Sequence, residues 1–201
     1  LIDTALHITN QSKAQQFVIN LLLAFLPAAI LGLVFHSAIK QYLFSPITVA
    51  IALIVGGFAI LWIEQLPLAT KTADIDDMTP KQALKVGFAQ SLALFPGVSR
   101  AGATILGGML FGLDRKTATE FSFFLAIPIM FGASTMKILK FGFNFTNLEL
   151  LILLSGMITA FVISILAIKF ILRYIKNNDF QVFGYYRIIL GIIIVSYFFL
   201  T

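Results

Sequence analysis

Five long apolar stretches constrain this chain more than any other feature of its sequence. They cover residues 17–35, 47–63, 119–136, 150–168 and 183–201. A helix rises about 1.5 Å per residue, so each stretch approaches the roughly 30 Å thickness of the hydrocarbon core of a bilayer. Pro27 and Pro128 lie inside two of the stretches, as kink points of the kind that membrane helices tolerate. We therefore expect an all-α, polytopic membrane bundle with about five spanning helices.

The composition excludes the main soluble classes of protein. Of the 201 residues, 59% are hydrophobic and 11% are charged, whereas soluble domains are about 25% charged. We expect a single membrane domain over residues 1–201 rather than a soluble enzyme, a disordered chain or a secreted mini-protein. The net charge of +5 is typical of Lys and Arg facing anionic headgroups, so membrane lipids, and not nucleic acid, are the expected partners. The chain has no cysteine, which excludes disulfides and Cys metal sites within it.

Residues 80–113 differ from the five apolar stretches because they contain two short arms around a break. Thr79-Pro80 is a helix-start signal, and residues 81–95 can then be helical. Pro96-Gly97 interrupts this arm, and residues 102–111 can form a second one. Each arm has about 10–15 residues, too few to cross a bilayer alone. The pattern predicts a re-entrant helix–loop–helix hairpin over about residues 80–113.

The distribution of positive charge supports the hairpin. If it enters and leaves on one side of the membrane, ten of the 14 Lys and Arg residues share that side, three lie opposite and Arg100 is at the tip. The three opposite are Lys40, Lys137 and Lys140. A single crossing by residues 80–113 would instead divide the charges six against seven. The positive-inside rule therefore favours the hairpin, with its open end on the cytoplasmic side.

The hairpin tip carries the residues that point to chemistry. An Arg at bilayer depth costs roughly 2.5–3.5 kcal/mol at a helix centre, so Arg100 needs an anionic partner or water. Gly97 and Gly102 allow close approach of a ligand, Ser99 and Thr104 supply hydroxyls, and a helix starting near Gly102 favours an anion. We interpret these five residues as a phosphate site. The alternative is a simple turn, with Ser99 as a helix cap and Arg100 as an interfacial residue, but charge-free runs flank Arg100 on both sides.

The same residues carry a family resemblance. The sequence PGVSRAGATILGGMLFGLDRKTATEFSFFLAIPIMFGAS, residues 96–134, closely resembles the second signature region of the bacterial undecaprenyl-diphosphatases, also called bacitracin-resistance proteins. The similarity extends over nearly the whole chain. It implies a multi-pass enzyme of the bacterial plasma membrane that removes the terminal phosphate of undecaprenyl diphosphate, recycling the lipid carrier for cell-wall synthesis and conferring bacitracin resistance.

The resemblance also implies details of the fold and the site. The family fold has inverted repeats with two re-entrant hairpins, and its members need a divalent cation, Mg²⁺ or Ca²⁺. Ser99, Arg100 and Thr104 match the phosphate-site positions and are the candidate catalytic residues. The sequence does not identify the residues that would hold this metal. The assembly to test is a homodimer. The alternative function is a lipid-carrier transporter or flippase, because broken helices and a phosphate-binding tip suit transport as well.

The chain departs from the family pattern in two ways, which bear on the expected phosphate site and on the expected activity. Ala101 stands where the family usually has Ser, so one hydroxyl of the site is missing. The family's first signature, a Glu-rich hairpin with Pro-x-Ser-Ser-x-x-His, has no equivalent in residues 1–201, and residue 1 is Leu, without a signal pattern after it. We expect that signature to lie upstream of Leu1, and residues 1–201 alone to be inactive.

Other polar residues give weaker signals. Gln90 is either a site residue or a neutral hydrogen-bonding group in the hairpin, and Glu120 either lines the site or starts a helix. We expect no catalytic role for His7 and His36. Asp74, Asp76 and Asp77 form a solvated loop in preference to a cation site.

Overall fold

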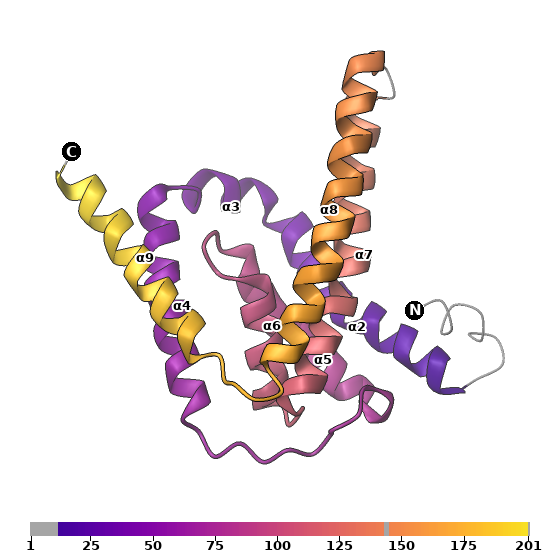
Figure 1. The fold of residues 1–201 in the computed structure, drawn as a ribbon, viewed down its shortest axis with the longest axis vertical. Coiled ribbons are helices and arrows are strands. Elements are labelled where there is room, and N and C mark those ends of the chain that lie inside the picture. Colours follow the sequence, from indigo (N-terminus) through magenta and orange to yellow (C-terminus); the bar gives the residue numbers. More distant parts are fainter. Residues whose placement is uncertain (1–11, 143–144, 201) are drawn as a thin grey trace. The chain divides into compact units, whose positions relative to one another are not determined.

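The computed structural model describes residues 12–142 and 145–200, and its described secondary structure is helical apart from one isolated bridge (Figure 1). Five helices are long and apolar enough to cross a membrane, which confirms the expected number. They are α2 (Ser12–Val34), α4 (Pro46–Glu64), α7 (Arg115–Phe141), α8 (Asn147–Tyr174) and α9 (Gln181–Leu200). His7 and the other residues before Ser12 lie outside the described part.

Local polar side chains decide where these helices begin. Ser45 caps α4, with its hydroxyl accepting a hydrogen bond from the Thr48 amide at 3.1 Å. Thr146 and Glu149 form a capping box at the start of α8, three residues before the expected apolar stretch. The Asp114 carboxylate accepts from the Thr117 amide at 2.6 Å, and α7 begins at Arg115 where residue 119 was expected. An apolar stretch marks only the part of a helix that lies in lipid, whereas capping residues set its true end.

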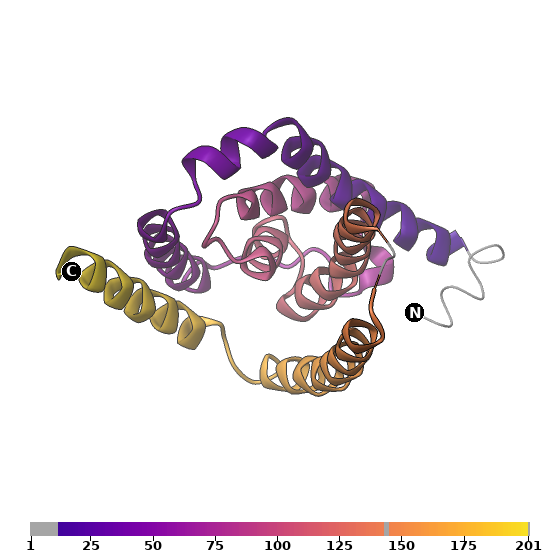
Figure 2. The same ribbon diagram turned by 90° about the horizontal axis from the view of Figure 1, so that it is seen from above.

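A short helix that the sequence analysis did not predict joins the first two long ones. It is α3 (His36–Tyr42), and it follows Phe35, whose backbone leaves the helical conformation. Seen from above, α3 connects α2 with α4, and α5 and α6 lie between these two long helices (Figure 2). The chain thus places its central hairpin between its first two candidate spans.

The central hairpin consists of α5 (Pro80–Ser91), the short 3₁₀ helix η2 (Leu92–Leu94) and α6 (Arg100–Leu110). Its two ends meet, because the side-chain amide of Gln82 on the first turn of α5 donates to the Phe111 carbonyl at 3.3 Å. The preceding loop joins them, since the amides of Lys71 and Thr72 donate to the Gly112 carbonyl at 2.8 and 3.0 Å. The arms themselves are closely packed, since a Cβ on Gly107 would lie 2.4 Å from the Cβ of Ala89. The helix–loop–helix geometry matches the expectation, and its re-entry into a membrane stays a prediction.

Glycines allow close contact between α4 and α9 and between α5 and α2. A Cβ on Gly57 of α4 would lie 2.7 Å from the carbonyl oxygen of Gly184 in α9, and one on Gly191 would lie 2.8 Å from the Ala50 carbonyl. A Cβ on Gly87 of α5 would lie 2.6 Å from the Ala24 carbonyl of α2. Small residues at helix crossings are typical of membrane proteins, because close backbone contact replaces the hydrophobic driving force.

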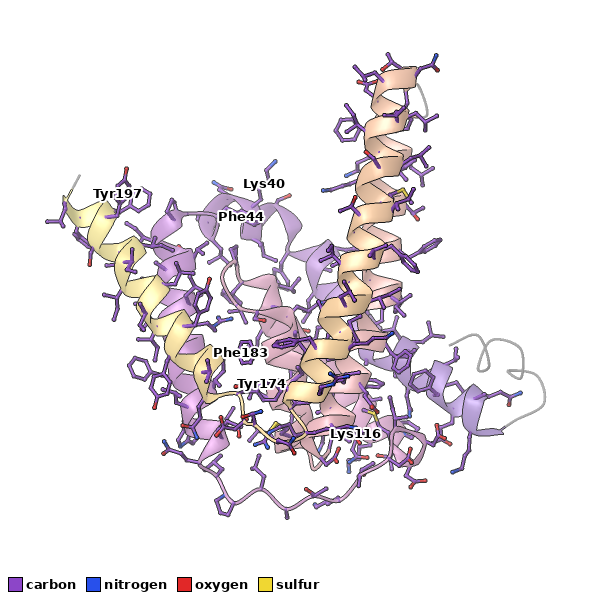
Figure 3. The ribbon with its side chains drawn as sticks, viewed as in Figure 1. Lys40, Phe44, Lys116, Tyr174, Phe183 and Tyr197 are labelled. Atoms are coloured by element: carbon purple, nitrogen blue, oxygen red, sulfur yellow. The ribbon has the colours of Figure 1, made fainter. Side chains whose placement is uncertain are left out.

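The chain divides into two compact units, residues 1–125 with 179–201 and residues 126–178. The second unit contains the later part of α7 and all of α8, and α8 has no buried residue. In the first unit, the labelled Lys40, Phe44 and Tyr197 lie at one end and Lys116 lies at the other (Figure 3). Lys40 and Lys116 thus lie at opposite ends of this unit, and the predicted topology assigns them to opposite sides of the membrane.

Candidate functional site

The turn at the hairpin tip is held against α4. Gly97 has a φ of +93°, and a Cβ there would lie 2.5 Å from the Val49 carbonyl oxygen. Both facts require glycine, because side chains disfavour positive φ and leave no room for the contact. The close approach that the sequence assigned to a ligand is therefore made, at Gly97, by the backbone of α4.

Ser99 and Arg100 form the first turn of α6. The Ser99 hydroxyl accepts a hydrogen bond from the Gly102 amide at 3.1 Å, so Ser99 is the N-cap and α6 begins at Arg100, before the expected Gly102. The Nη1 atom of Arg100 is buried and has no hydrogen-bond partner within the described part of the chain. A helix N-terminus beside a guanidinium with a free donor suits an anion, since both contribute positive potential and N–H groups.

Thr104 lies one turn further along α6 and faces α7. Its side chain is 1% exposed, and its hydroxyl is 2.6 Å from the Ser122 hydroxyl of α7. The same hydroxyl donates toward the Arg100 carbonyl, 3.0 Å away. Ser122, which the sequence analysis did not single out, is thus part of the polar group around the first turn of α6. It stands in the EFSF sequence that carried part of the resemblance.

A second guanidinium reaches the tip from the last helix. Nη2 of Arg187 donates to the Gly97 carbonyl at 2.8 Å and to the Ala52 carbonyl at 3.3 Å. A Cβ on Gly56 would lie 2.5 Å from the same nitrogen. The sequence analysis gave Arg187 no role at the tip, although it stands near the start of the apolar stretch 183–201. Its signal was its place within that stretch, because a charge at such a depth needs a partner.

Gln90 and Glu120 contact other parts of the described chain than Arg100. The Gln90 amide is 2% exposed and donates weakly, at 3.4 Å, to the Ala24 carbonyl of α2, while its oxygen has no partner among the described residues. The Glu120 carboxylate is 3.8 Å from the ammonium of Lys116, one helical turn earlier. Gln90 therefore contacts α2, the helix against which α5 packs, and the half-buried Glu120 pairs with the exposed Lys116.

The remaining carboxylates have structural contacts. Glu64, 1% exposed, pairs with Arg115 and accepts a hydrogen bond from the Phe180 amide at 3.0 Å, which joins α4, α7 and the start of α9. Asp74 caps the 3₁₀ helix η1 (Ile75–Asp77), and Asp77 is 3.7 Å from Lys13. Across residues 12–142 and 145–200, no three His, Asp or Glu side chains gather as a metal site would require. The described residues therefore do not by themselves provide a cradle for Mg²⁺ or Ca²⁺.

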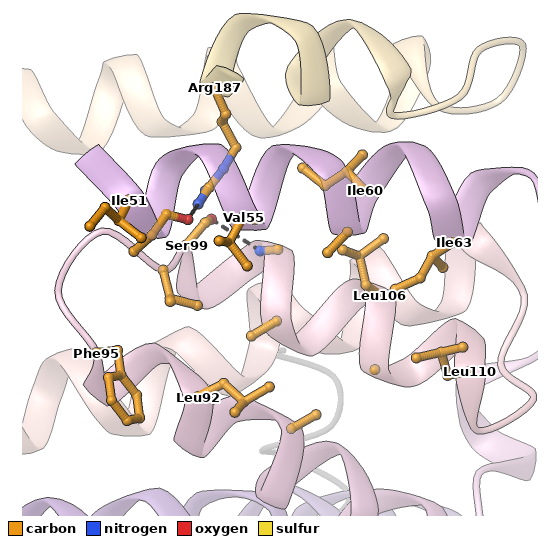
Figure 4. Close-up of a pocket in the computed structure, with 18 of the residues that line it drawn as sticks. Ile51, Val55, Ile60, Ile63, Leu92, Phe95, Ser99, Leu106, Leu110 and Arg187 are labelled. Atoms are coloured by element: carbon orange, nitrogen blue, oxygen red, sulfur yellow. Dashed lines mark hydrogen bonds between the residues drawn. The ribbon is translucent and has the colours of Figure 1, made fainter. Parts of the chain in front are cut away.

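An apolar cavity of about 720 Å³ lies beside the tip, between α4 and the hairpin. Figure 4 shows Ser99 and the guanidinium of Arg187 at this cavity, with Ile60, Ile63 and Leu106 along it. Ser99 therefore belongs to the candidate phosphate site and also lines this apolar cavity.

Comparison with known proteins identifies the family. Residues 2–193 match the family described as bacitracin resistance protein BacA. A relative from Methylobacillus flagellatus, named undecaprenyl-diphosphatase, is 56% identical over 98% of this chain and 74% of its own length. Relatives of the same name from Pseudomonas fluorescens and Neisseria gonorrhoeae are 48% and 49% identical, over 98% and 91% of this chain and 71% and 68% of their own. The chain therefore belongs to the bacitracin resistance protein BacA family.

Proposed function

We infer that this protein is an undecaprenyl-diphosphatase of the bacterial plasma membrane. The reaction adds water across the phosphoric anhydride, so that undecaprenyl phosphate and inorganic phosphate are formed and the lipid carrier returns to cell-wall synthesis. The relatives' names and the family support this function. The observation that carries it in the molecule is the buried, unpartnered Nη1 of Arg100 on the first turn of α6.

Arg100 binds the diphosphate in this proposal. Its guanidinium offers a planar pair of N–H donors to two phosphate oxygens, and it neutralises charge that develops on the leaving phosphate. The amides of the first turn of α6, beside Ser99 and Gly102, add donors that need no rearrangement. Thr104 supports Arg100 through its contacts with the Arg100 carbonyl and Ser122.

The groups that attack phosphorus and manage protons are not assigned to any described residue. The tip contributes cationic and hydrogen-bonding groups, and the ion-paired carboxylates of the described residues, Glu64, Asp77 and Glu120, pair with residues outside it. A requirement for Mg²⁺ or Ca²⁺ follows from the resemblance, and removal of divalent cations with a chelator tests it.

The test of the function is phosphate release from undecaprenyl diphosphate in detergent, with the full-length protein, including any residues before Leu1. Arg100→Lys keeps the charge but loses the planar pair of donors, and we expect turnover to fall at least about tenfold, or 1.4 kcal/mol. Arg173→Lys on α8 is the matched control, because Arg173 is exposed. Near-normal turnover by Arg100→Lys would contradict the assignment of Arg100.

A lipid-carrier transporter remains the second candidate, because the hairpin is a broken helix of the kind that transporters use. The same assay separates the two functions, since a pure flippase releases no phosphate. A homodimer stays a prediction, which light scattering of the purified protein in detergent tests.

A further inference from the structure

Arg187 is a cation without a counter-charge in a helix that is long and apolar enough to cross a membrane. The ion pairs among the described residues are Lys13–Asp77, Glu64–Arg115 and Lys116–Glu120. None of them neutralises Arg187. An ionised side chain within a membrane span is costly, and it is usually paired with another charge or with a functional ligand. The described part of the chain therefore leaves the charge of Arg187 to be balanced by something else.

The hydrogen bonds of Arg187 to the described residues use one of its three nitrogens. Nη2 donates to the carbonyls of Gly97 and Ala52. Nε is buried without a hydrogen-bond partner among the described residues, and the same two bonds leave Nη1 free. Every nitrogen of a guanidinium carries N–H donors. The turn of the hairpin thus satisfies part of the hydrogen-bonding capacity of Arg187 and none of its charge.

Arg187 lines the same cavity as Ser99, the cap of α6 (Figure 4). Arg100 follows Ser99 directly, and its Nη1 is also buried without a partner in the described part of the chain. Two guanidiniums that form none of the ion pairs above therefore belong to one hairpin tip. Like charges repel strongly where water is scarce, unless an anion accompanies them. Such a pair suits a ligand with more than one negative charge.

We propose that Arg187 is a second phosphate-binding residue of the tip. Its Nη2 holds the turn at Gly97, while its Nη1 and its charge serve one of the two phosphates of the lipid diphosphate and Arg100 serves the other. The proposal rests on the proposed function, because that function supplies a ligand with two phosphates. Loss of one phosphate in the reaction would leave one guanidinium without its anion. Arg187 would thus favour binding of the diphosphate substrate over the monophosphate product.

The first experiment measures equilibrium binding to the full-length protein in detergent. The probes are a polyprenyl methylenediphosphonate, in which CH₂ replaces the bridging oxygen and prevents hydrolysis, and the polyprenyl monophosphate. Arg187→Gln keeps a neutral donor but removes the charge, and Arg173→Gln on exposed α8 is the matched control. We expect Arg187→Gln to raise Kd at least about tenfold for the diphosphonate and less than about threefold for the monophosphate. Equal losses for both probes would mean that Arg187 only positions the tip, and would overturn the proposal.

A second variant moves the guanidinium and keeps its charge. A Cβ on Gly56 would lie 2.5 Å from Nη2 of Arg187 and 3.1 Å from its Cζ, so Gly56→Ala must displace the end of this flexible side chain. We expect a preferential loss of diphosphonate binding that is smaller than the loss in Arg187→Gln. Gly132→Ala is the control, because its Cβ would have nothing within 4 Å. Unchanged diphosphonate binding by Gly56→Ala would show that the place of the guanidinium does not matter to the ligand.

A phospholipid headgroup is the other source of phosphate in a bilayer, and a third measurement separates the two. The unaltered protein is placed in phosphatidylcholine nanodiscs with and without phosphatidylglycerol, and binding of the diphosphonate is compared. We expect Kd to change less than about twofold, whereas displacement by phosphatidylglycerol would assign Arg187 to a phospholipid instead. Absence of phosphate release by the unaltered protein would contradict the proposed function, while the binding measurements would still report on Arg187.

Discussion

The guanidinium of Arg187 donates a hydrogen bond to the backbone carbonyl of Gly97 over 2.8 Å, joining two residues 90 positions apart in the sequence. Gly97 is the turn of the hairpin, and Arg187 belongs to the last long helix, α9. The same nitrogen also reaches the Ala52 carbonyl of α4. One side chain of α9 thus joins the tip, two residues before Ser99, to α4.

Replacement of Arg187 should therefore displace the tip. Arg187→Leu removes charged hydrogen bonds and should lower the free energy of unfolding by about 1.5–3 kcal/mol. Arg187→Lys retains one donor group without the planar fork, so its stability and its phosphate release should lie between those of Arg187→Leu and the unaltered protein. Thermal unfolding and phosphate release by the full-length protein measure these effects, with Arg173→Leu as the control. Full turnover by Arg187→Leu would show that the tip keeps its position without this contact.

The hydroxyls of Thr104 and Ser122 should be energetically coupled. Thr104→Val leaves the buried Ser122 hydroxyl without this partner, 2.6 Å away in the structure, and should cost about 1–3 kcal/mol of stability. Ser122→Ala should cost a similar amount. The double variant should cost less than the sum, with a coupling of about 0.5–3 kcal/mol. Additive losses in chemical unfolding would mean that the two hydroxyls do not interact in the membrane-embedded protein.

Gly57 should tolerate no side chain, whereas Gly132 should. A Cβ on Gly57 would lie 2.7 Å from the Gly184 carbonyl of α9, and a Cβ on Gly132 of α7 would have nothing within 4 Å. Gly57→Ala must therefore move α4 away from α9 and should cost about 1–3 kcal/mol. Gly132→Ala should be neutral or stabilising by about 0.5–1 kcal/mol, because alanine loses less backbone entropy in a helix. Equal melting temperatures for the two variants would refute the close crossing of α4 and α9.

The topology of the hairpin is open to a labelling test. Lys71 and Lys116 flank the hairpin and are exposed, whereas Lys40 lies at the other end of its unit (Figure 3). The chain has no cysteine, so single Lys→Cys variants report without background. A membrane-impermeant maleimide should label the first two positions only after cells are permeabilised, and the third in intact cells. Labelling of Lys71→Cys and Lys116→Cys from opposite faces would mean that residues 80–113 cross the membrane once.

Thr72 and Thr117 are poor labelling positions, although their sequence context predicts loops. Thr72 is 7% exposed and Thr117 is 1% exposed. The Thr72 amide donates to the Gly112 carbonyl, and the Thr117 hydroxyl donates to the Ala73 carbonyl. The structure shows that Thr72 and Thr117, one on each side of the hairpin, are buried. Burial of a polar loop depends on which other segment closes over it, and residues 71–72 and 112–114 come together only when the hairpin closes.

Local sequence predicted the turn at the tip but not the packing around it. The Pro96-Gly97 break and the capping hydroxyl of Ser99 were predictable, because turn and cap effects depend on neighbouring residues. The burial of the Thr104 hydroxyl against Ser122 was not, since it depends on the packing of α7 against α6. Glu64 gave no local signal of its partner, and only the folded chain shows its ion pair with Arg115.

What the sequence alone determined was the class of the fold, the number of long apolar helices and the tip motif, because hydrocarbon length, helix capping and chain breaks act over a few residues. The tertiary structure decided which faces meet. It placed Arg187 on the Gly97 carbonyl and opened the cavity between α4 and α6, beside Ser99. These arrangements depend on close contacts at Gly56, Gly57 and Gly184. Such contacts are set by the mutual orientation of helices distant in sequence, and no local pattern of residues specifies that orientation.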